Sequence, residues 1–196
     1  MARKAREKSL YSTYWIEQTC TVVDFFASDE ERSYFLGCLG RTSRQYGYYI
    51  IGYRLDSCGY HLIIYDNGND ITKIMRTLNI EYALKVNREG FKLKSRFKSK
   101  RLLDNTHLLE AISQISTDSD CNPYNSYSHQ CVTEGHMVHD TIAMAIFSHN
   151  RETYTAFIKK QISLLDEVIP QNIMEPSCEK QCIKTYQEGT IQLEAL

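Results

Sequence analysis

The chain has 196 residues, which suits one domain of ordinary size that can bury a core. No stretch approaches the roughly 20 consecutive apolar residues that span a bilayer, and no apolar segment follows the basic N-terminus, so we expect a soluble cytoplasmic protein rather than a membrane protein. The net charge of -1 conceals an asymmetry, because residues 1–101 hold 18 Lys and Arg against 11 Asp and Glu, whereas the remainder holds 5 against 13. A basic first half predicts a local site for a polyanion.

The first elements are a strand and a helix. Residues 12–23 alternate aromatic or β-branched side chains with polar ones, which is typical of a strand. Ser28 with Glu31 three residues later forms a capping box, and the apolar positions that follow predict a helix that runs to about Tyr46.

A β-hairpin is predicted over residues 49–65. Two apolar and β-branched runs flank the polar stretch Asp56–Gly59, which has the composition of a tight turn. His61 lies two residues into the second strand, where alternation places its imidazole on the face of Ile63 and Tyr65. A histidine there is either packed in the sheet or directed into a site.

A second helix and a basic strand follow the hairpin. Asp70 is an N-cap for a helix with apolar residues at three- and four-residue steps, ending near Gly90. Residues 91–101 then alternate cations with apolar or small residues, as in a strand with one cationic face. The order strand, helix, two strands, helix, strand predicts an α+β sheet with helices on one face.

The basic strand has two interpretations. Its cations, together with a basic N-terminal arm, are suited to tracking a nucleic-acid backbone. The alternative is a solvated edge strand whose lysines prevent aggregation. The positions that we assign to DNA binding are Arg3, Lys4, Arg6, Lys92, Lys94, Arg96, Lys98, Lys100 and Arg101.

The second half is helical and acidic. Asp104 is expected to cap a short helix, and a polar loop is expected over residues 117–133. Two helical patterns follow, over 136–147 and 150–168, and we expect a weakly ordered tail after Pro170. The predicted units are a domain over 1–133, a C-terminal helical pair over 134–168 and a tail over 169–196.

Metal-binding residues are a separate possibility. His61 alone is a weak signal because the neighbouring strand positions offer no partner ligand. Two other groups have ligand-type side chains but no recognised zinc spacing, and scattered polar residues explain them better than a metal site does. These groups are His129, Cys131, His136 and His139, and Cys178 with Cys182. No Gly-rich phosphate loop, nucleophile elbow or carboxylate pair indicates an enzyme.

Several segments together resemble the REP-associated tyrosine transposases and related insertion-sequence transposases of the HUH single-strand nuclease superfamily. The resemblance runs to about residue 165 and is carried by the order and spacing of the segments. They read MARKAR, DEERSYFLGCL, YGYYIIGYRLDSCGYHLII, ITKIMRTLNIEYALKVNREG, FKLKSRFKSKRL, NPYNSY and AIFSHNRETYTAFIKK.

The resemblance implies a ferredoxin-like antiparallel sheet with a His-hydrophobe-His motif that binds a divalent metal, Mg²⁺ or Mn²⁺. A tyrosine on a later helix would attack a DNA phosphate. In this chain His61 occupies the position of the motif's second histidine. Gly59 occupies the position of the first histidine, and Gln114 occupies the position of the nucleophilic tyrosine. Asp118 falls where a further polar metal-site residue is expected.

Three tyrosines are considered as replacements for the missing nucleophile: Tyr82, Tyr124 and Tyr127. Tyr82 is the first candidate, although an aromatic residue is common at that position in the family, which favours packing.

The leading hypothesis is a transposase-like protein that binds single-stranded or hairpin DNA with a degenerate active site. One alternative is an active metal-dependent transposase or nickase with relocated residues. Another is a protein-interaction or zinc-binding module. The oligomeric state is left open.

Overall fold

The computed structural model describes residues 11–19, 24–86, 96–116, 122–128, 138–139 and 141–166. Four strands form one antiparallel sheet in the order β2-β3-β1-β4. The elements are β1 (Thr13–Thr19), α1 (Asp29–Tyr46), β2 (Tyr49–Asp56), β3 (Gly59–Tyr65), α2 (Ile71–Val86), β4 (Lys98–Leu102), α3 (Asn105–Ser116), α5 (Thr141–Ile146) and α6 (Arg151–Asp166). This order confirms the α+β class, and the strand order is that of the ferredoxin-like βαββαβ arrangement.

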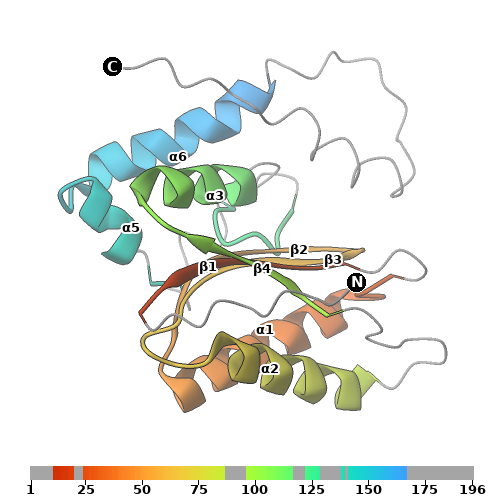
Figure 1. Ribbon diagram of the computed structural model, residues 1–196. Helices are drawn as coiled ribbons and strands as arrows, with labels where there is room; N and C mark the ends of the chain where they lie inside the picture. Colours follow the sequence, from red (N-terminus) through yellow and green to blue (C-terminus); the bar gives the residue numbers. More distant parts are fainter. Residues whose placement is uncertain are drawn as a thin grey trace, which may run out of the picture.

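The sheet lies between two helical layers (Figure 1). Helices α1 and α2 cover one face, and α3 and α6 lie over the other, with α5 at one side. Each face of the sheet therefore has its own core. None of the helices in the described part of the chain has the length and apolarity to cross a membrane.

The predicted helix starts are confirmed by their caps. The Ser28 hydroxyl accepts a hydrogen bond from the Glu31 backbone N–H, and the Glu31 carboxylate accepts from the Ala27 N–H. Helix α1 ends at Gly47, whose left-handed φ of 67° is one that glycine adopts without strain. Asp70 accepts from the Thr72 N–H at the start of α2.

The core beneath α1 and α2 is largely aromatic. Phe25, Phe35, Tyr60 and Tyr82 are fully buried there, and the rings of Phe25 and Tyr82 stack with centroids 5.5 Å apart. Such ring pairs add attraction beyond their burial of apolar area. The other core lies between the sheet and α3, α5 and α6.

One expectation for the second half requires correction. The helix predicted from His136 begins only at Thr141, because Val138 forms an isolated parallel bridge with Ile50 and the His139 N–H donates to the Ile50 carbonyl. Backbone groups that pair with a distant strand in this way are not available for the first turn of a helix.

The polar loop expected over 117–133 is described over residues 122–128, and this part lies against β2. The Leu55 N–H donates to the Tyr124 carbonyl, and the Ser126 N–H donates to the Tyr53 carbonyl. The segment thus covers the outer edge of β2, which removes unpaired backbone groups that would otherwise attract another strand.

The predicted basic strand is described from residue 96 onward. β4 covers Lys98–Leu102, preceded by the exposed Arg96 and the buried Phe97. Residues 91–95 of the predicted strand, the basic N-terminal arm and the predicted tail over 169–196 lie outside the described residues, and the predicted domain boundaries stay a prediction.

Candidate nucleic-acid interface

Four ionisable side chains form a row across the sheet, one from each strand. In sheet order they are Arg54, His61, Glu17 and Lys98, and each is paired in register with the next. Directly opposed residues on antiparallel strands point to the same face of the sheet. The row lies on the α3 face, because Ile63, two residues from His61, packs in the core beneath α3.

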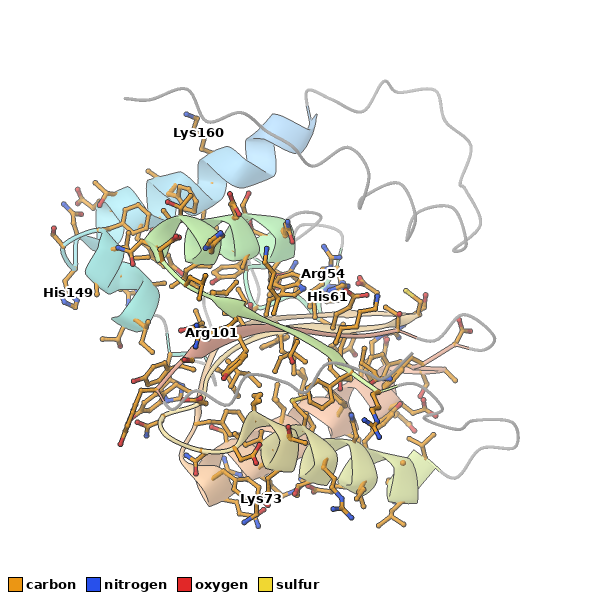
Figure 2. All side chains as sticks on the ribbon, in the orientation of Figure 1. Arg54, His61, Lys73, Arg101, His149 and Lys160 are labelled. Atoms are coloured by element: carbon orange, nitrogen blue, oxygen red, sulfur yellow. The ribbon has the colours of Figure 1, made fainter. Side chains whose placement is uncertain are left out.

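Arg54 connects the sheet to the end of α3. Its Nε donates to Asp56 Oδ2 at 3.1 Å, and its Nη1 donates to the Gln114 carbonyl oxygen at 2.9 Å. Figure 2 shows Arg54 and His61 side by side between the sheet and α3. A cation is favoured at this place because the last carbonyls of a helix carry partial negative charge.

His61 is a neutral, mostly buried imidazole. Its side chain is 15% exposed, its ring packs on Trp15 with centroids 5.4 Å apart, and its Nδ1 is buried without a hydrogen-bond partner among the described residues. Burial lowers the pKa of His61 to about 3, and the cations of Arg54 and Lys98 act in the same direction. Its Nε2 lies 3.7 Å from Asp56 Oδ2, too far for a hydrogen bond.

The β4 cations face both sides of the sheet. Lys98 and Lys100 lie opposite Glu17 and Trp15 of β1, on the His61 face, whereas Arg101 belongs to the other face by alternation. Lys98 Nζ lies 3.1 Å from Glu17 Oε1, yet the lysine side chain is 72% exposed and the glutamate only 7%. The edge strand therefore presents an accessible cation, Lys98, at the end of the row.

Gly59 has no room for a side chain. A Cβ at this position would lie 2.0 Å from the Gln18 carbonyl oxygen and 2.9 Å from the Thr19 Cα of β1. Both contacts are with backbone atoms, which cannot rotate away. A histidine at position 59 would thus require the two strands to move apart.

The structure places the candidate tyrosines in or against the two cores, and only Tyr127 of the three belongs to the core on the His61 side of the sheet. Tyr82 is fully buried in the core on the opposite face of the sheet, where its hydroxyl donates to the Phe25 carbonyl at 2.9 Å. Tyr124 packs against that same core. Tyr127 lies in the α3 core and donates to the Ile51 carbonyl. The side chain of Gln114 is exposed near the end of α3.

The described residues do not fit a divalent metal at His61. Within the described ranges, no three side chains of His, Cys, Asp or Glu come together as ligands. Gly59 supplies no donor, and the Asp56 oxygen nearest to His61 already accepts from Arg54. Among the other candidate ligands, the His139 ring packs on the Tyr49 ring. The remaining candidates lie outside the described residues: Asp118, His129, Cys131, His136, Cys178 and Cys182.

Sequence reasoning missed Arg54, Asp56 and Glu17. The sequence did contain a signal for Arg54. A two-residue turn at Ser57–Cys58 fixes the register of the hairpin and places Arg54 directly opposite His61. Glu17 gave no comparable signal, since the pairing of β1 with β3 and β4 joins segments that are distant in the sequence.

Comparison with known proteins supports the fold. No known family profile and no curated protein matches the sequence. A solved structure of a REP-associated tyrosine transposase bound to a REP hairpin is similar, with a TM-score of 0.54 and 13% sequence identity. The similarity covers 69% of this chain and 87% of that one. At this identity the likeness is one of fold.

Proposed function

We propose that the protein is a transposase-like DNA-binding protein that binds single-stranded or hairpin DNA and has lost strand cleavage. The observation that carries the proposal is the set of exposed cations at and just before β4. Arg96, Lys98 and Lys100 are exposed, and the two lysines share a sheet face with His61 and Arg54. Phosphates supply most of the affinity of such proteins, and they bind Lys and Arg.

The fold supports the choice of partner. The similar solved structure is of a REP-associated tyrosine transposase bound to a REP hairpin, and the likeness covers most of that chain. An aromatic residue on the same face, Trp15, is only partly buried and lies next to Lys100 in register. Partly exposed indoles beside cations are typical of surfaces that bind unpaired bases.

The loss of cleavage rests on Gly59 and Gln114. Gly59 cannot carry the first histidine that the resemblance leads one to expect, because the β1 backbone occupies that space. The helix expected to supply a tyrosine has Gln114 instead, and a glutamine amide is no nucleophile toward phosphate.

Gel-shift measurements test the binding half of the proposal. The probe is a DNA hairpin with a single-stranded foot, at low and raised salt. We expect the triple variant Arg96→Ala, Lys98→Ala, Lys100→Ala to bind at least about tenfold more weakly, with a salt dependence reduced by about two in slope. The matched control is Arg44→Ala, Lys73→Ala, Arg76→Ala, which removes the same charge from α1 and α2 on the opposite face (Figure 2 labels Lys73).

Three results would contradict the binding half: no binding at low salt, equal losses in the two triple variants, or binding that does not respond to salt. The cleavage half is tested by incubating the protein with the hairpin and Mg²⁺ or Mn²⁺. We expect no covalent protein–DNA adduct that survives denaturation. An adduct that disappears in a His61→Ala variant would establish the active alternative.

A further inference from the structure

The guanidinium of Arg54 lies at the β2 end of the row, next to the end of α3. Two of its nitrogens are held from opposite directions, Nε by Asp56 on β2 and Nη1 by the Gln114 carbonyl at the end of α3. Within the described residues, Nη2 has no hydrogen-bond partner, and the side chain is 16% exposed. The group is therefore fixed in position, and Nη2 still has both of its N–H donors to offer.

Two cations flank His61 in the row, and each is paired with a carboxylate: Arg54 with Asp56 and Lys98 with Glu17. Arg54 lies opposite His61 on β2, and Lys98 lies beyond Glu17 on β4. Both cations disfavour a proton on the His61 ring. The same repulsion acts more strongly on a divalent ion, because the energy scales with the product of the charges. A metal ion bound by both His61 and the nearby Asp56 oxygen would compete with Arg54 for that oxygen.

We infer that Arg54 binds a DNA phosphate directly, so that this face recognises its ligand without the metal ion that the resemblance implied. The inference rests on the proposed function and names the group that contacts the DNA. A guanidinium carries a full charge and oriented N–H donors, which match phosphate oxygens. Asp56 and the α3 carbonyl hold the side chain in place, so little conformational entropy is lost when phosphate binds.

Lys98 serves a neighbouring phosphate. Arg54 and Lys98 are on strands β2 and β4, with β3 and β1 between them, so their Cα atoms are three strand spacings, or about 14 Å, apart. One phosphate cannot bridge that distance. A strand of DNA that follows the row would thus contact Arg54 and Lys98 at different positions along its backbone.

The test measures hairpin binding by fluorescence anisotropy in EDTA and in Mn²⁺, with three variants. We expect the unsubstituted protein to bind equally, within about twofold, in the two buffers. Arg54→Gln should lose about tenfold in affinity, and Arg54→Lys should lose less because it keeps the charge without the planar donors. The control is Arg76→Gln, which removes one exposed arginine charge from α2 on the opposite face and should change affinity by less than about twofold.

The outcomes distinguish this inference from the proposed function. Binding that EDTA abolishes and Mn²⁺ restores would overturn the inference, as would an Arg54→Gln loss no larger than that of Arg76→Gln, while DNA binding itself stands. Absence of any binding by the unsubstituted protein would overturn both. Thermal melting checks the fold of each variant, and the comparison of EDTA with Mn²⁺ depends on no variant.

Discussion

Arg54 and His61 face each other across the β2–β3 hairpin and approach the same carboxylate oxygen. Arg54 Nε lies 3.1 Å and His61 Nε2 lies 3.7 Å from Asp56 Oδ2. The arginine makes the hydrogen bond, so the negative charge that would stabilise an imidazolium is already neutralised. Burial, together with this fixed cation, lowers the pKa of His61 and keeps the imidazole uncharged.

The first prediction concerns the pH dependence of stability. The pKa of His61 falls from 6.5 to about 3 on folding, so the unfolded chain takes up a proton at higher pH than the native state does. This contribution to stability is fully present above pH 6.5 and is lost as the pH falls toward about 3. The free energy of unfolding, measured with urea over this pH range, should fall less steeply with decreasing pH for His61→Gln than for the unsubstituted protein. Parallel curves would contradict the assignment.

The second prediction concerns the close approach of β3 to β1 at Gly59. Gly59→Ala should lower the free energy of unfolding by about 3 kcal/mol, because the added methyl meets backbone atoms of Gln18 and Thr19. The control is Gly37→Ala in α1, where the nearest atom is the flexible Arg41 guanidinium. There we expect a gain of about 0.5–1 kcal/mol from helix propensity. Equal effects in urea unfolding would disprove the steric argument.

The third prediction assigns Tyr82 to packing. Tyr82→Phe removes the hydrogen bond to the Phe25 carbonyl and should cost about 1–2 kcal/mol of stability. Affinity for the hairpin should not change, because the residue lies on the face opposite to His61. Tyr11→Phe, at a ring that is 65% exposed, should have no measurable effect on stability. A Tyr82→Phe variant of normal stability with altered DNA binding or adduct formation would reverse the assignment.

The fourth prediction concerns the missing nucleophile. Gln114→Tyr should fold, because the Gln114 side chain is exposed and Arg54 contacts only its backbone carbonyl. The variant should form no covalent adduct with hairpin DNA in Mg²⁺ or Mn²⁺, since Gly59 still supplies no ligand. A denaturing gel detects any covalent protein–DNA adduct. An adduct formed by this variant would contradict the prediction, because it would show that the tyrosine alone restores strand cleavage.

Local signals in the sequence are enough to define most elements. The Ser28 and Asp70 caps, the alternation around His61 and the apolar steps of α2 all correspond to hydrogen bonds or burial within a few residues of the chain. These features depend on φ/ψ preferences and short-range contacts, which the sequence expresses directly. The α+β class follows from the order of these elements, and the hairpin pattern by itself marks His61, whereas Gly59 stands out only through the family resemblance.

Only the tertiary structure decided what surrounds His61. Glu17, His61 and Lys98 come from three strands whose register depends on the packing of both cores, and nothing near each residue in the sequence encodes it. The start of α5 is likewise set by a bridge from Val138 to distant Ile50. The lack of room for a side chain at Gly59 likewise depends on the position of the neighbouring strand β1. The sequence alone identified a glycine where a histidine was expected, and the fold supplied the physical reason: the backbone of β1 occupies that place.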